Sequence, residues 1–451
     1  MDHAGATLYP VSLVQDHSKD LTSHLLSNPH SRSPSSIATE NQVTNIRQRV
    51  LQSFNANTEF FDVVFVANAT AGIKLVADGF AASAQGFRYK YLTDAHTSLV
   101  GLGQLASARQ SLSEDEVHKW LNDTSEQERP TQPGLFAYPA QSNMTGRRFP
   151  LSWPTKLRET HPGWYCLLDG ASYLTTTPLD FYDFNAAPDF TVLSFYKIFG
   201  YPDLGAVVVK KDSGSMLVQR KFFGGGSRGG VTVNGFHIPQ TTLYEALEDG
   251  TLPFHTILAL DHAFNNFSRL FGGHSQVARH ASLVASLAHR LLASLHHRNG
   301  YPVCKIYSNL GHGPIIAFNL YDENASPIGY VDFEKKSSLR GFALRTGGMC
   351  NPGGIQKHCG LSEDDLRHLF LDIGKRCNDT NDIIDGKTIG AIRISFGACS
   401  NVEDVVALVE FIKEIYVAKK ENFKHSMKRR RSLGLSLSKW VISLGPVRRK
   451  D

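Results

Sequence analysis

Short apolar runs that alternate with helix-like segments are the feature that most constrains how this chain can fold. Residues 61–67 (FDVVFVA) have the length of a buried strand, and residues 68–84 begin with polar residues and continue with helical spacing of apolar ones. Further strand-like runs follow at residues 89–94, 134–140, 163–174, 190–197 and 204–211. Continuous apolar strands separated by helices are typical of a parallel sheet buried on both faces. We therefore predict an α/β fold with a mostly parallel sheet.

The pattern changes in the second half of the chain. A long helical stretch covers residues 274–300, short strands are expected around residues 313–321 and 391–398, and a closing helix near residues 402–418. We expect a large domain over residues 1–260, whose first ~40 residues pack on the small domain, a small α+β domain over 261–418, and a tail or linker over 419–451. Residues 27–36 are expected to form a polar loop, and residues 111–130 an acidic, polar excursion.

The net charge of +5 is concentrated in the tail. Residues 419–451 carry 11 Lys and Arg against 2 Asp and Glu, which leaves 36 against 40 in the rest of the chain. This distribution argues against a body that binds nucleic acid. No apolar run reaches the roughly 18 residues of a membrane-spanning helix and residues 1–30 lack a signal-peptide pattern, so a cytoplasmic protein is expected. The six cysteines include no C-x-x-C pair and are expected to be reduced, and no metal site is predicted.

Polar residues stand at the ends of predicted strands. Asn68, Ala69 and Thr70 open the helix after the first strand, where free N–H groups suit a phosphate, although Asn or Thr at this place is more often only a helix cap. Asp169 ends a later strand and is equally well explained as a cap for the next turn. Because the carboxyl ends of parallel strands meet in one crevice, these residues are expected to lie close together.

Lys197 closes the apolar run at residues 190–197, beside Ser194. A lysine at a strand end is usually a surface group, but one desolvated in a crevice has a lowered pKa and can act as a nucleophile. An anion-binding helix start, an acidic strand end and a crevice lysine together match pyridoxal phosphate, which needs donors for its phosphate, a carboxylate for its pyridine nitrogen and an amine for its aldehyde. A dinucleotide site is disfavoured, because no G-x-G-x-x-G joins a strand to a helix and the glycine run at 224–230 lacks that context.

Six motifs extend this interpretation to a family. They are DHAGATLYP (2–10), DAHTSLVG (94–101), FAYPAQSNMTGRRFPL (136–151), LSFYKIFGYPDLGAVVV (193–209), EDGTLPF (248–254) and LRTGGMCNPGG (344–354). Along nearly all of residues 1–415 the chain resembles the aminotransferase class V type of pyridoxal-phosphate enzyme, cysteine desulfurases in particular, and among these the amino-terminal domains of eukaryotic molybdenum cofactor sulfurases. The resemblance implies a fold-type-I pyridoxal-phosphate enzyme that forms a homodimer.

The resemblance also implies roles for individual residues. Lys197 falls on the lysine that joins the cofactor aldehyde and later moves protons, Asp169 on the partner of the pyridine nitrogen, and His96 on the ring that stacks over the cofactor. Thr251 falls on a phosphate ligand that the partner subunit contributes. Phosphate contacts fall on Ala69, Thr70 and Ser194, and the neighbour of the cofactor hydroxyl falls on Ser172. A cofactor or substrate contact falls on Asn143. Two arginines near the substrate carboxylate fall on Arg345 and Arg393.

Cys350 lies five residues after Arg345 in a glycine-rich segment, where desulfurases keep the cysteine that receives sulfur. A lone cysteine is usually a small buried hydrophobe, but sulfur transfer needs an exposed and mobile thiolate, which such a segment can present. Tyr196 stands where many desulfurases have a histidine, which favours the sulfurase branch. Gly348 and Ile355 occupy places where sulfurases often carry further cysteines.

The resemblance thus implies that L-cysteine is desulfurated, that Cys350 carries the sulfur as a persulfide, and that the molybdenum cofactor is the final acceptor. In eukaryotic sulfurases a carboxyl-terminal domain handles that cofactor, so the acceptor is expected to be reached through a domain separate from, or missing from, this chain. Two alternatives stay open. One is a cysteine desulfurase or lyase that serves another acceptor. The other is a catalytically degenerate scaffold of the same fold, with the KRRR run at 428–431 as a docking or nuclear-import patch.

Overall fold

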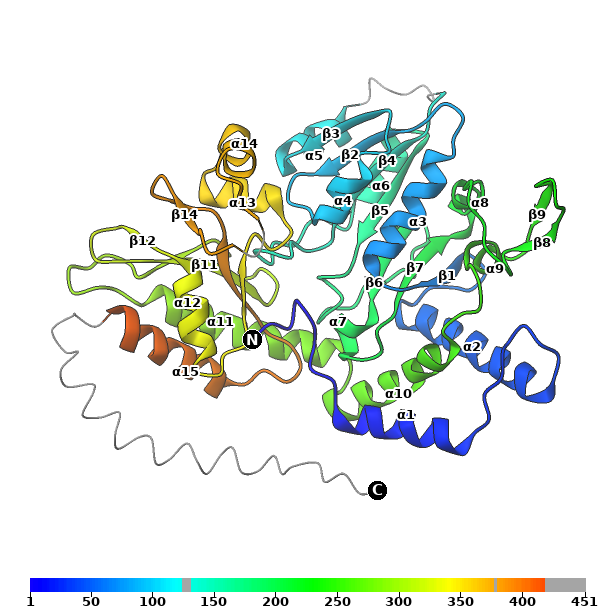
Figure 1. Cartoon of the computed structure of the whole chain (residues 1–451), viewed down its shortest axis with the longest axis horizontal. Helices are drawn as coiled ribbons and strands as arrows, with labels where there is room; N and C mark the ends of the chain where they lie inside the picture. The colour runs from blue at the N-terminus through cyan, green and yellow to red at the C-terminus, as the bar shows by residue number, and fades with distance from the viewer. Residues whose placement is uncertain (124–130, 377–378, 418–451) are drawn as a thin grey trace.

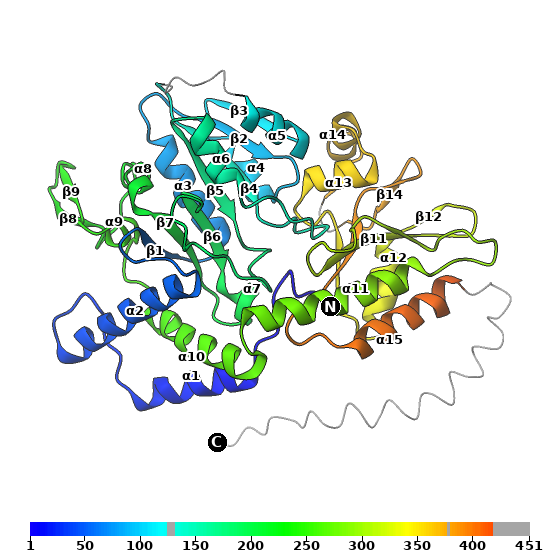
Figure 2. The ribbon, with the colours of Figure 1, turned by 180° about the vertical axis from the view of Figure 1, so that it is seen from behind.

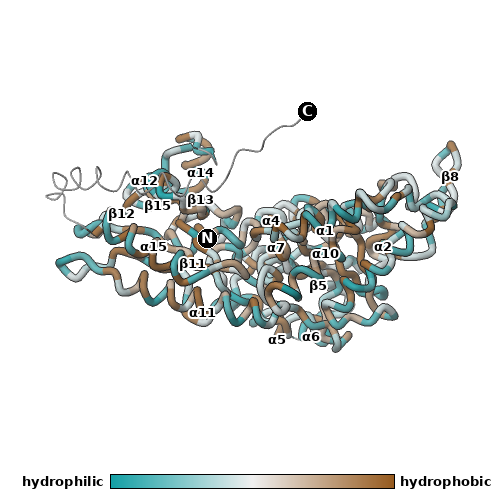
Figure 3. The backbone as a smooth tube through the Cα atoms, turned by 90° about the horizontal axis from the view of Figure 1, so that it is seen from below, coloured by the Kyte–Doolittle hydropathy of each residue, from teal (hydrophilic) through white to brown (hydrophobic). Residues whose placement is uncertain are grey.

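The computed structural model describes residues 1–123, 131–376 and 379–417, and the basic tail predicted over residues 419–451 lies outside the described residues. Two packed parts lie side by side along the long axis of the molecule (Figures 1 and 3). The larger part contains a seven-stranded sheet, and the smaller part a five-stranded sheet. Within the described ranges, no helix is both long and apolar enough to cross a lipid bilayer.

The strands of the large sheet lie in the order β1-β7-β6-β5-β4-β2-β3. Their bounds are β1 (Phe61–Val66), β2 (Arg88–Leu92), β3 (Ala108–Leu112), β4 (Gly134–Pro139), β5 (Trp164–Asp169), β6 (Phe190–Ser194) and β7 (Gly205–Lys210). The predicted mostly parallel sheet is confirmed, since β3, β2, β4, β5 and β6 pair in parallel. β7 is antiparallel to both β6 and β1. The connection from β6 to β7 covers only residues 195–204, which is shorter than a parallel crossover needs, so the chain turns back beside β6.

Both faces of this sheet are buried, because successive residues of a strand enter different apolar cores. Val63 and Leu168 belong to the core of one face, and Val64 and Leu167 to that of the other. The first core is covered by α2 (Pro34–Ser53), α5 (Glu114–Asn122), α6 (Trp153–Thr160) and α10 (Phe254–Phe271). The second is covered by α3 (Ala69–Ala81), α4 (Thr97–Leu102) and α8 (Ser215–Val218). Figures 1 and 2 show the sheet from its two sides.

The segment expected to be an acidic excursion over residues 111–130 contains a regular helix, α5. Ser113 caps this helix: its hydroxyl accepts a hydrogen bond from Glu116 N–H, and the Glu116 carboxylate accepts one from Ser113 N–H. The capping box and the acidic first turn stabilise the helix, and the buried Val117 and Leu121 attach it to the sheet. The described part of this acidic segment is therefore helical and packs on the sheet.

The smaller part has the strand order β10-β11-β16-β13, with β12 beside β11, and these pairs are antiparallel. Its strands are β10 (Cys304–Ile306), β11 (Ile315–Tyr321), β12 (Pro327–Ile328), β13 (Arg345–Gly347) and β16 (Ala391–Ser395). Its helices are α11 (His274–Ala293), α12 (Tyr330–Ser338), α13 (Pro352–Cys359), α14 (Glu363–Leu371) and α15 (Val402–Ile412). The predicted long helix, short strands and closing helix are confirmed, and they share one apolar core.

Short elements complete the described chain. They are α7 (Phe195–Phe199), η1 (Lys211–Ser213), β8 (Arg228–Val231), β9 (His237–Pro239), α9 (Leu243–Leu247), β14 (Ile383–Ile384), β15 (Lys387–Thr388) and η2 (Lys413–Val417). The hairpin of β8 and β9 projects from the larger part, at the end of the molecule opposite to α12 and α15 (Figures 1 and 3).

The beginning of the chain contacts both parts. Asp2 forms a β-bridge with Ser395 on β16, and Ala4 N–H donates to Ser395 Oγ at 2.9 Å. The chain then forms α1 (Val11–Ser23), and both α1 and α2 pack against α10 of the larger part. The polar loop expected over residues 27–36 ends at Ser33, whose side chain caps α2 ahead of a proline at the first helical position.

Candidate active site

A cavity of about 320 Å³ opens at the carboxyl ends of β4, β5 and β6. This is the edge at which α/β sheets place their ligands. Predicted site residues from five separate stretches of the sequence line it, namely Ala69, Thr70, His96, Asn143, Asp169, Ser172, Ser194 and Lys197. The fold therefore brings these side chains around one space.

The N-terminus of α3 forms one end of the cavity. Ser194 Oγ accepts a hydrogen bond from Ala69 N–H at 2.9 Å, which ties the end of β6 to the start of this helix. The hydroxyl groups of Thr70 and Ser98 lie 2.9 Å apart at the same place. A helix N-terminus beside two hydroxyl groups suits a bound anion, because N–H and O–H groups donate and the helix dipole is positive there.

Lys197 lies in α7, directly after β6. Burial lowers the pKa of its amine, and the negative charge of Asp169 opposes that shift. A lowered pKa increases the fraction of neutral amine, which is the nucleophilic form. Its main chain is also held, since the Lys197 carbonyl accepts a hydrogen bond from Thr7 Oγ1 at 2.7 Å and Gly200 ends the helix with a φ of 80°.

His96 caps α4 and lines the same cavity. Its Nδ1 accepts a hydrogen bond from Ser98 N–H at 3.1 Å, so the proton of the neutral ring lies on Nε2. Burial lowers the pKa of His96, an effect that Asp169 opposes and Lys197 reinforces. The ring therefore favours the neutral form, with one N–H donor directed away from its own helix cap.

Asp169 and Ser172 lie along one wall of the cavity. Asp169 is buried, and its Oδ1 accepts a hydrogen bond from Ala171 N–H at 2.9 Å. The Ser172 hydroxyl lies 3.2 Å from Nε2 of Gln141, a fully buried side chain that also lines the cavity. A buried glutamine amide thus stands beside Ser172, from the segment that follows β4.

Cys350 lies on the loop of residues 347–351, between β13 and α13, and its side chain is exposed. Met349 and Cys350 both have left-handed backbones, with φ of 55° and 51°, which is uncommon for residues other than glycine. Two of the hydrogen bonds that dock this loop on the larger part are made to its main-chain carbonyls. Thr97 N–H donates to the Cys350 carbonyl at 2.8 Å, and Asn143 Nδ2 donates to the Met349 carbonyl at 2.7 Å. The thiol-bearing loop is therefore held beside the cavity.

The two predicted arginines lie opposite each other on adjacent strands, Arg345 on β13 and Arg393 on β16. Arg345 is exposed and Arg393 is buried. Arg393 Nη1 donates to the Asn143 carbonyl at 2.8 Å, which places its guanidinium next to a residue that lines the cavity. Its salt-bridge partner is Asp2, at 2.7 Å.

Thr251 does not line the Lys197 cavity. It is exposed and lies at a separate opening of about 380 Å³, together with Phe65, Arg220 and Phe222. Within one chain, Thr251 is thus not brought to the other predicted phosphate contacts.

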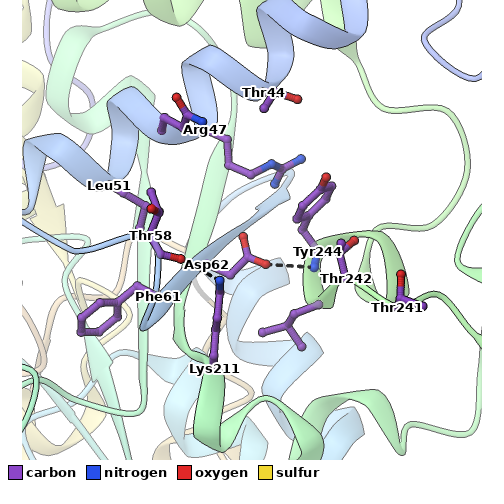
Figure 4. Close-up of a pocket in the computed structure, with 12 residues that line it drawn as sticks. Thr44, Arg47, Leu51, Thr58, Phe61, Asp62, Lys211, Thr241, Thr242 and Tyr244 are labelled. Carbon is purple, nitrogen blue, oxygen red and sulfur yellow. Dashed lines mark hydrogen bonds between the residues drawn. The ribbon is translucent and has the colours of Figure 1, made fainter.

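A larger cavity, of about 470 Å³, lies between α2, β1 and the start of α9, and none of the predicted site residues lines it (Figure 4). Its charged side chains have partners within the protein. Arg47 forms a buried salt bridge with Glu248 at 2.8 Å, and Asp62 accepts a hydrogen bond from the backbone N–H of Tyr244 at 3.3 Å. Size alone therefore does not mark the functional site.

Sequence reasoning missed three residues of the site, Asp2, Ser98 and Gln141, and named a fourth, Tyr196, only as a marker of the family branch. All four lie inside motifs that carried the family resemblance, so proximity to a motif was the available signal. Asp2 could not be paired with Arg393 from spacing, since the two residues are 391 positions apart. Among the described residues, no group of three or more His, Cys, Asp or Glu side chains is arranged to hold a metal ion.

Comparison with known proteins agrees with this geometry. The family model for aminotransferase class V matches residues 1–408. The chain belongs to the aminotransferase class V family. Two curated relatives are the molybdenum cofactor sulfurases of Aspergillus oryzae, 46% identical over 438 residues, and of Aspergillus niger, 47% identical over 439 residues. Each match covers 94% of this chain and 53% of the relative, so the class V chain spans about half the length of the curated relatives it matches.

Solved structures show the same fold. The apo cysteine desulfurase of Thermococcus onnurineus NA1 superposes with a TM-score of 0.72 at 16% identity, covering 92% of this class V chain and 94% of that chain. A variant of the cystine C-S lyase C-DES, with glycine covalently linked to its PLP cofactor, gives a TM-score of 0.66 at 15% identity and covers 91% and 94%. The predicted architecture is confirmed: the chain has the fold-type-I α/β fold of these enzymes.

Proposed function

We propose that the Lys197 cavity binds pyridoxal 5′-phosphate. The N-terminus of α3 with Thr70 and Ser98 suits the phosphate, Asp169 suits the pyridine nitrogen, and Lys197 suits the aldehyde. The class V family and the PLP-bound C-DES structure of the same fold support this choice of cofactor. When bound, the cofactor supplies an electron-poor ring that stabilises negative charge on the α-carbon of an amino acid.

The side chains of the cavity then have separate tasks. Lys197 holds the cofactor and moves a proton at the substrate, a role that the lowered pKa of its amine favours. The Asp169 carboxylate favours a protonated ring nitrogen. Neutral His96 covers the reacting atoms and keeps water away from them.

Cys350 gives the chain its specific reaction, the desulfuration of L-cysteine. The carbon–sulfur bond of the substrate breaks, a sulfur–sulfur bond to Cys350 forms, and the thiol proton replaces sulfur on the carbon, so the products are L-alanine and a Cys350 persulfide without any added oxidant or reductant. The single observation that carries this proposal is the docking of the Cys350 loop beside the Lys197 cavity, through Thr97 N–H and the Asn143 amide. We assign the substrate carboxylate to Arg345 and Arg393. The hydrogen bond from Arg393 to the carbonyl of Asn143, a residue that lines the cavity, and the position of Arg345 opposite Arg393 support this assignment.

The molybdenum cofactor is the proposed acceptor of the persulfide sulfur. Support comes from the relatives of 46–47% identity that carry the name molybdenum cofactor sulfurase, and from the exposed position of Cys350, from which sulfur can be handed on. Because this chain spans about half of those relatives, their whole activity is a proposal here.

A cytoplasmic homodimer of two-domain subunits, divided near residue 260, completes the proposal. Ala69 and Ser194 reach the cofactor phosphate from the same chain as Lys197. Thr251 is exposed and separate from Lys197, so a second copy of the chain is needed to bring Thr251 to that phosphate. The five described cysteines form no disulfide, in keeping with a reducing compartment.

The test is to add pyridoxal phosphate and L-cysteine to the purified protein and to measure L-alanine and protein persulfide. We expect a persulfide on Cys350, and Cys350→Ala should lose it and release alanine at least ~100-fold more slowly. Cys399→Ala, which changes another exposed cysteine, should behave like the parent. Parental alanine release by Cys350→Ala would identify a lyase that frees sulfur directly, and no alanine from the parent would identify a degenerate scaffold.

A further inference from the structure

The first nine residues form a strap between the small sheet and α7. At one end Asp2 bridges Ser395 on β16, the strand that also carries Arg393. At the other end Thr7 Oγ1 donates to the Lys197 carbonyl at 2.7 Å. Figure 1 shows this segment running between the two parts of the molecule, from the label N toward α1. The strap therefore joins the strand of the buried arginine to the helix of the cavity lysine.

Arg393 is held from two sides, and one of its three nitrogens has no partner in the part of the chain that the structure describes. Only 5% of its side chain is exposed. Nη2 donates to Asp2 Oδ1 at 2.7 Å, and Nη1 donates to the Asn143 carbonyl at 2.8 Å. Its Nε–H is buried and has no hydrogen-bond partner among the described residues. A guanidinium fixed at two nitrogens keeps its plane, so the direction of the N–H on the third nitrogen, Nε, is fixed as well.

A second arginine increases the need for the Asp2 carboxylate. Arg345 lies opposite Arg393 in the register of β13 and β16. Burial lowers the pKa of Arg393, and the like charge of Arg345 adds to this effect, whereas Asp2 opposes it. Removing one partner of a buried ion pair leaves an uncompensated charge, which moves toward water or toward another partner. Without Asp2, Arg393 would therefore lose its orientation.

We propose that Asp2 is a positioning residue for substrate recognition: it orients Arg393 so that the free Nε–H receives the carboxylate of the amino-acid substrate. The inference rests on the proposed function and deepens it. A buried donor without a partner is costly unless a ligand satisfies it, and a carboxylate is the ligand that a guanidinium binds with the best geometry. Asp2 remains in place when substrate binds, because Asn143 and Asp2 occupy nitrogens other than Nε.

The binding test compares two ligands that differ by a carboxylate, L-alanine and ethylamine. Each is titrated into holoenzyme and followed by the absorbance of the bound cofactor. Asp2→Leu removes charge and acceptor but keeps the branching at Cγ, and should weaken L-alanine binding by at least about tenfold while ethylamine stays within about twofold. Asp2→Asn keeps an acceptor oxygen for Nη2 of Arg393 and should lose less of the affinity for L-alanine than Asp2→Leu does. Asp404 is exposed and lies close in space to the amino group of Met1. Asp404→Asn makes the same charge change there as Asp2→Asn and should bind both ligands like the parent.

The same variants separate positioning from other roles. With L-cysteine, Asp2→Leu should raise KM while kcat stays within a few fold of the parent. Equal weakening of L-alanine and ethylamine would show a general structural role, and tighter L-alanine binding would show that Asp2 competes with the substrate carboxylate. Either result overturns the proposal.

A structural readout keeps the test independent of turnover. In a crystal structure of the Asp2→Leu apoprotein, we expect the Arg393 guanidinium to have left the Asn143 carbonyl. An unchanged guanidinium would overturn the role of Asp2 whether or not the protein desulfurates cysteine. Failure of the parent to release alanine would instead refute the proposed function, and the crystal structure would still decide the role of Asp2.

Discussion

The side-chain amide of Asn143 donates a hydrogen bond of 2.7 Å to the main-chain carbonyl of Met349, and this bond fastens the Cys350 loop to the wall of the Lys197 cavity. The Oδ1 atom of the same amide accepts a hydrogen bond from Asn351 at 3.0 Å. The family resemblance assigned Asn143 to a cofactor or substrate contact. In the structure both the nitrogen and the oxygen of its side-chain amide hydrogen-bond to the loop. A ligand that replaces these hydrogen bonds would also loosen the thiol-bearing loop.

We predict that Asn143→Ala loosens the loop of residues 347–351. The left-handed backbones of Met349 and Cys350 are costly and persist only while neighbouring bonds hold them, so losing the amide should favour an undocked loop. The Thr97 amide, which donates to the Cys350 carbonyl, should then exchange hydrogen about tenfold faster. Met349→Leu keeps the main-chain carbonyl and is the control. Unchanged exchange at Thr97 in Asn143→Ala would show that the other contacts suffice to dock the loop.

Lys197→Ala should abolish covalent attachment of pyridoxal phosphate. Lys197 is the lysine that lines the cavity, and burial lowers the pKa of its amine. The measurement is the fraction of protein labelled after borohydride reduction. Lys210→Arg is a matched control, because Lys210 is also a strand-end lysine whose pKa burial lowers, but it lies outside this cavity. Labelling that survives in Lys197→Ala and falls in Lys210→Arg would show that the cofactor is attached to Lys210 and not to Lys197.

The strands and the strand-end residues could be predicted because each follows from local patterns. The apolar run at residues 61–67 is enough by itself to predict a buried strand. Asp169 and Ser194 are likewise predicted at strand ends because each directly follows an apolar run. Parallel topology then requires the ends to meet, which is why the predicted residues share one cavity.

The features that escaped prediction depend on distant contacts. The reversed direction of β7 follows from the short connection after Lys197, not from the apolar pattern of the strand itself. The pairing of Asp2 with Arg393 joins residues 391 positions apart, and Gln141 reaches Ser172 from the segment that follows β4. Sequence spacing carries no information on such pairs when only one sequence is read. Thr251 shows the same limit across subunits, since its expected place requires a second chain.

We predict that Glu248→Gln destabilises the protein by about 3–5 kcal/mol, because Arg47 would be left as a buried and unpaired charge. The Glu248 carboxylate accepts hydrogen bonds from both Nη atoms of Arg47 and from Phe65 N–H, so it also fixes the edge strand β1. Urea denaturation measures the change in the free energy of unfolding. Lys74→Ala, which breaks the exposed pair with Asp78, should cost less than about 1 kcal/mol. Equal losses in the two variants would contradict the importance of burial.

The last prediction concerns the loss of stability in acid that the burial of His3 causes. Burial lowers the pKa of His3 from 6.5 to about 4, and its Nδ1 has no hydrogen-bond partner among the described residues. In the unfolded chain the ring binds a proton below pH 6.5, whereas in the folded chain it stays neutral until about pH 4. The contribution of His3 to stability is therefore fully present above pH 6.5. It is lost as the pH falls from 6.5 to 4, at up to about 1.4 kcal/mol per pH unit.

His3→Phe keeps a ring that can pack against Gly397 but cannot titrate. We expect the free energy of unfolding of this variant to fall less than that of the parent between pH 6.5 and pH 4, so that the two profiles converge or cross as the pH decreases. Urea denaturation at half-unit pH steps measures both profiles. His237→Asn changes an exposed histidine on β9 and should leave the parental profile unchanged. Parallel profiles for the parent and His3→Phe would mean that the His3 ring is protonated in the folded protein, and that the strap tolerates a positive charge beside the small sheet.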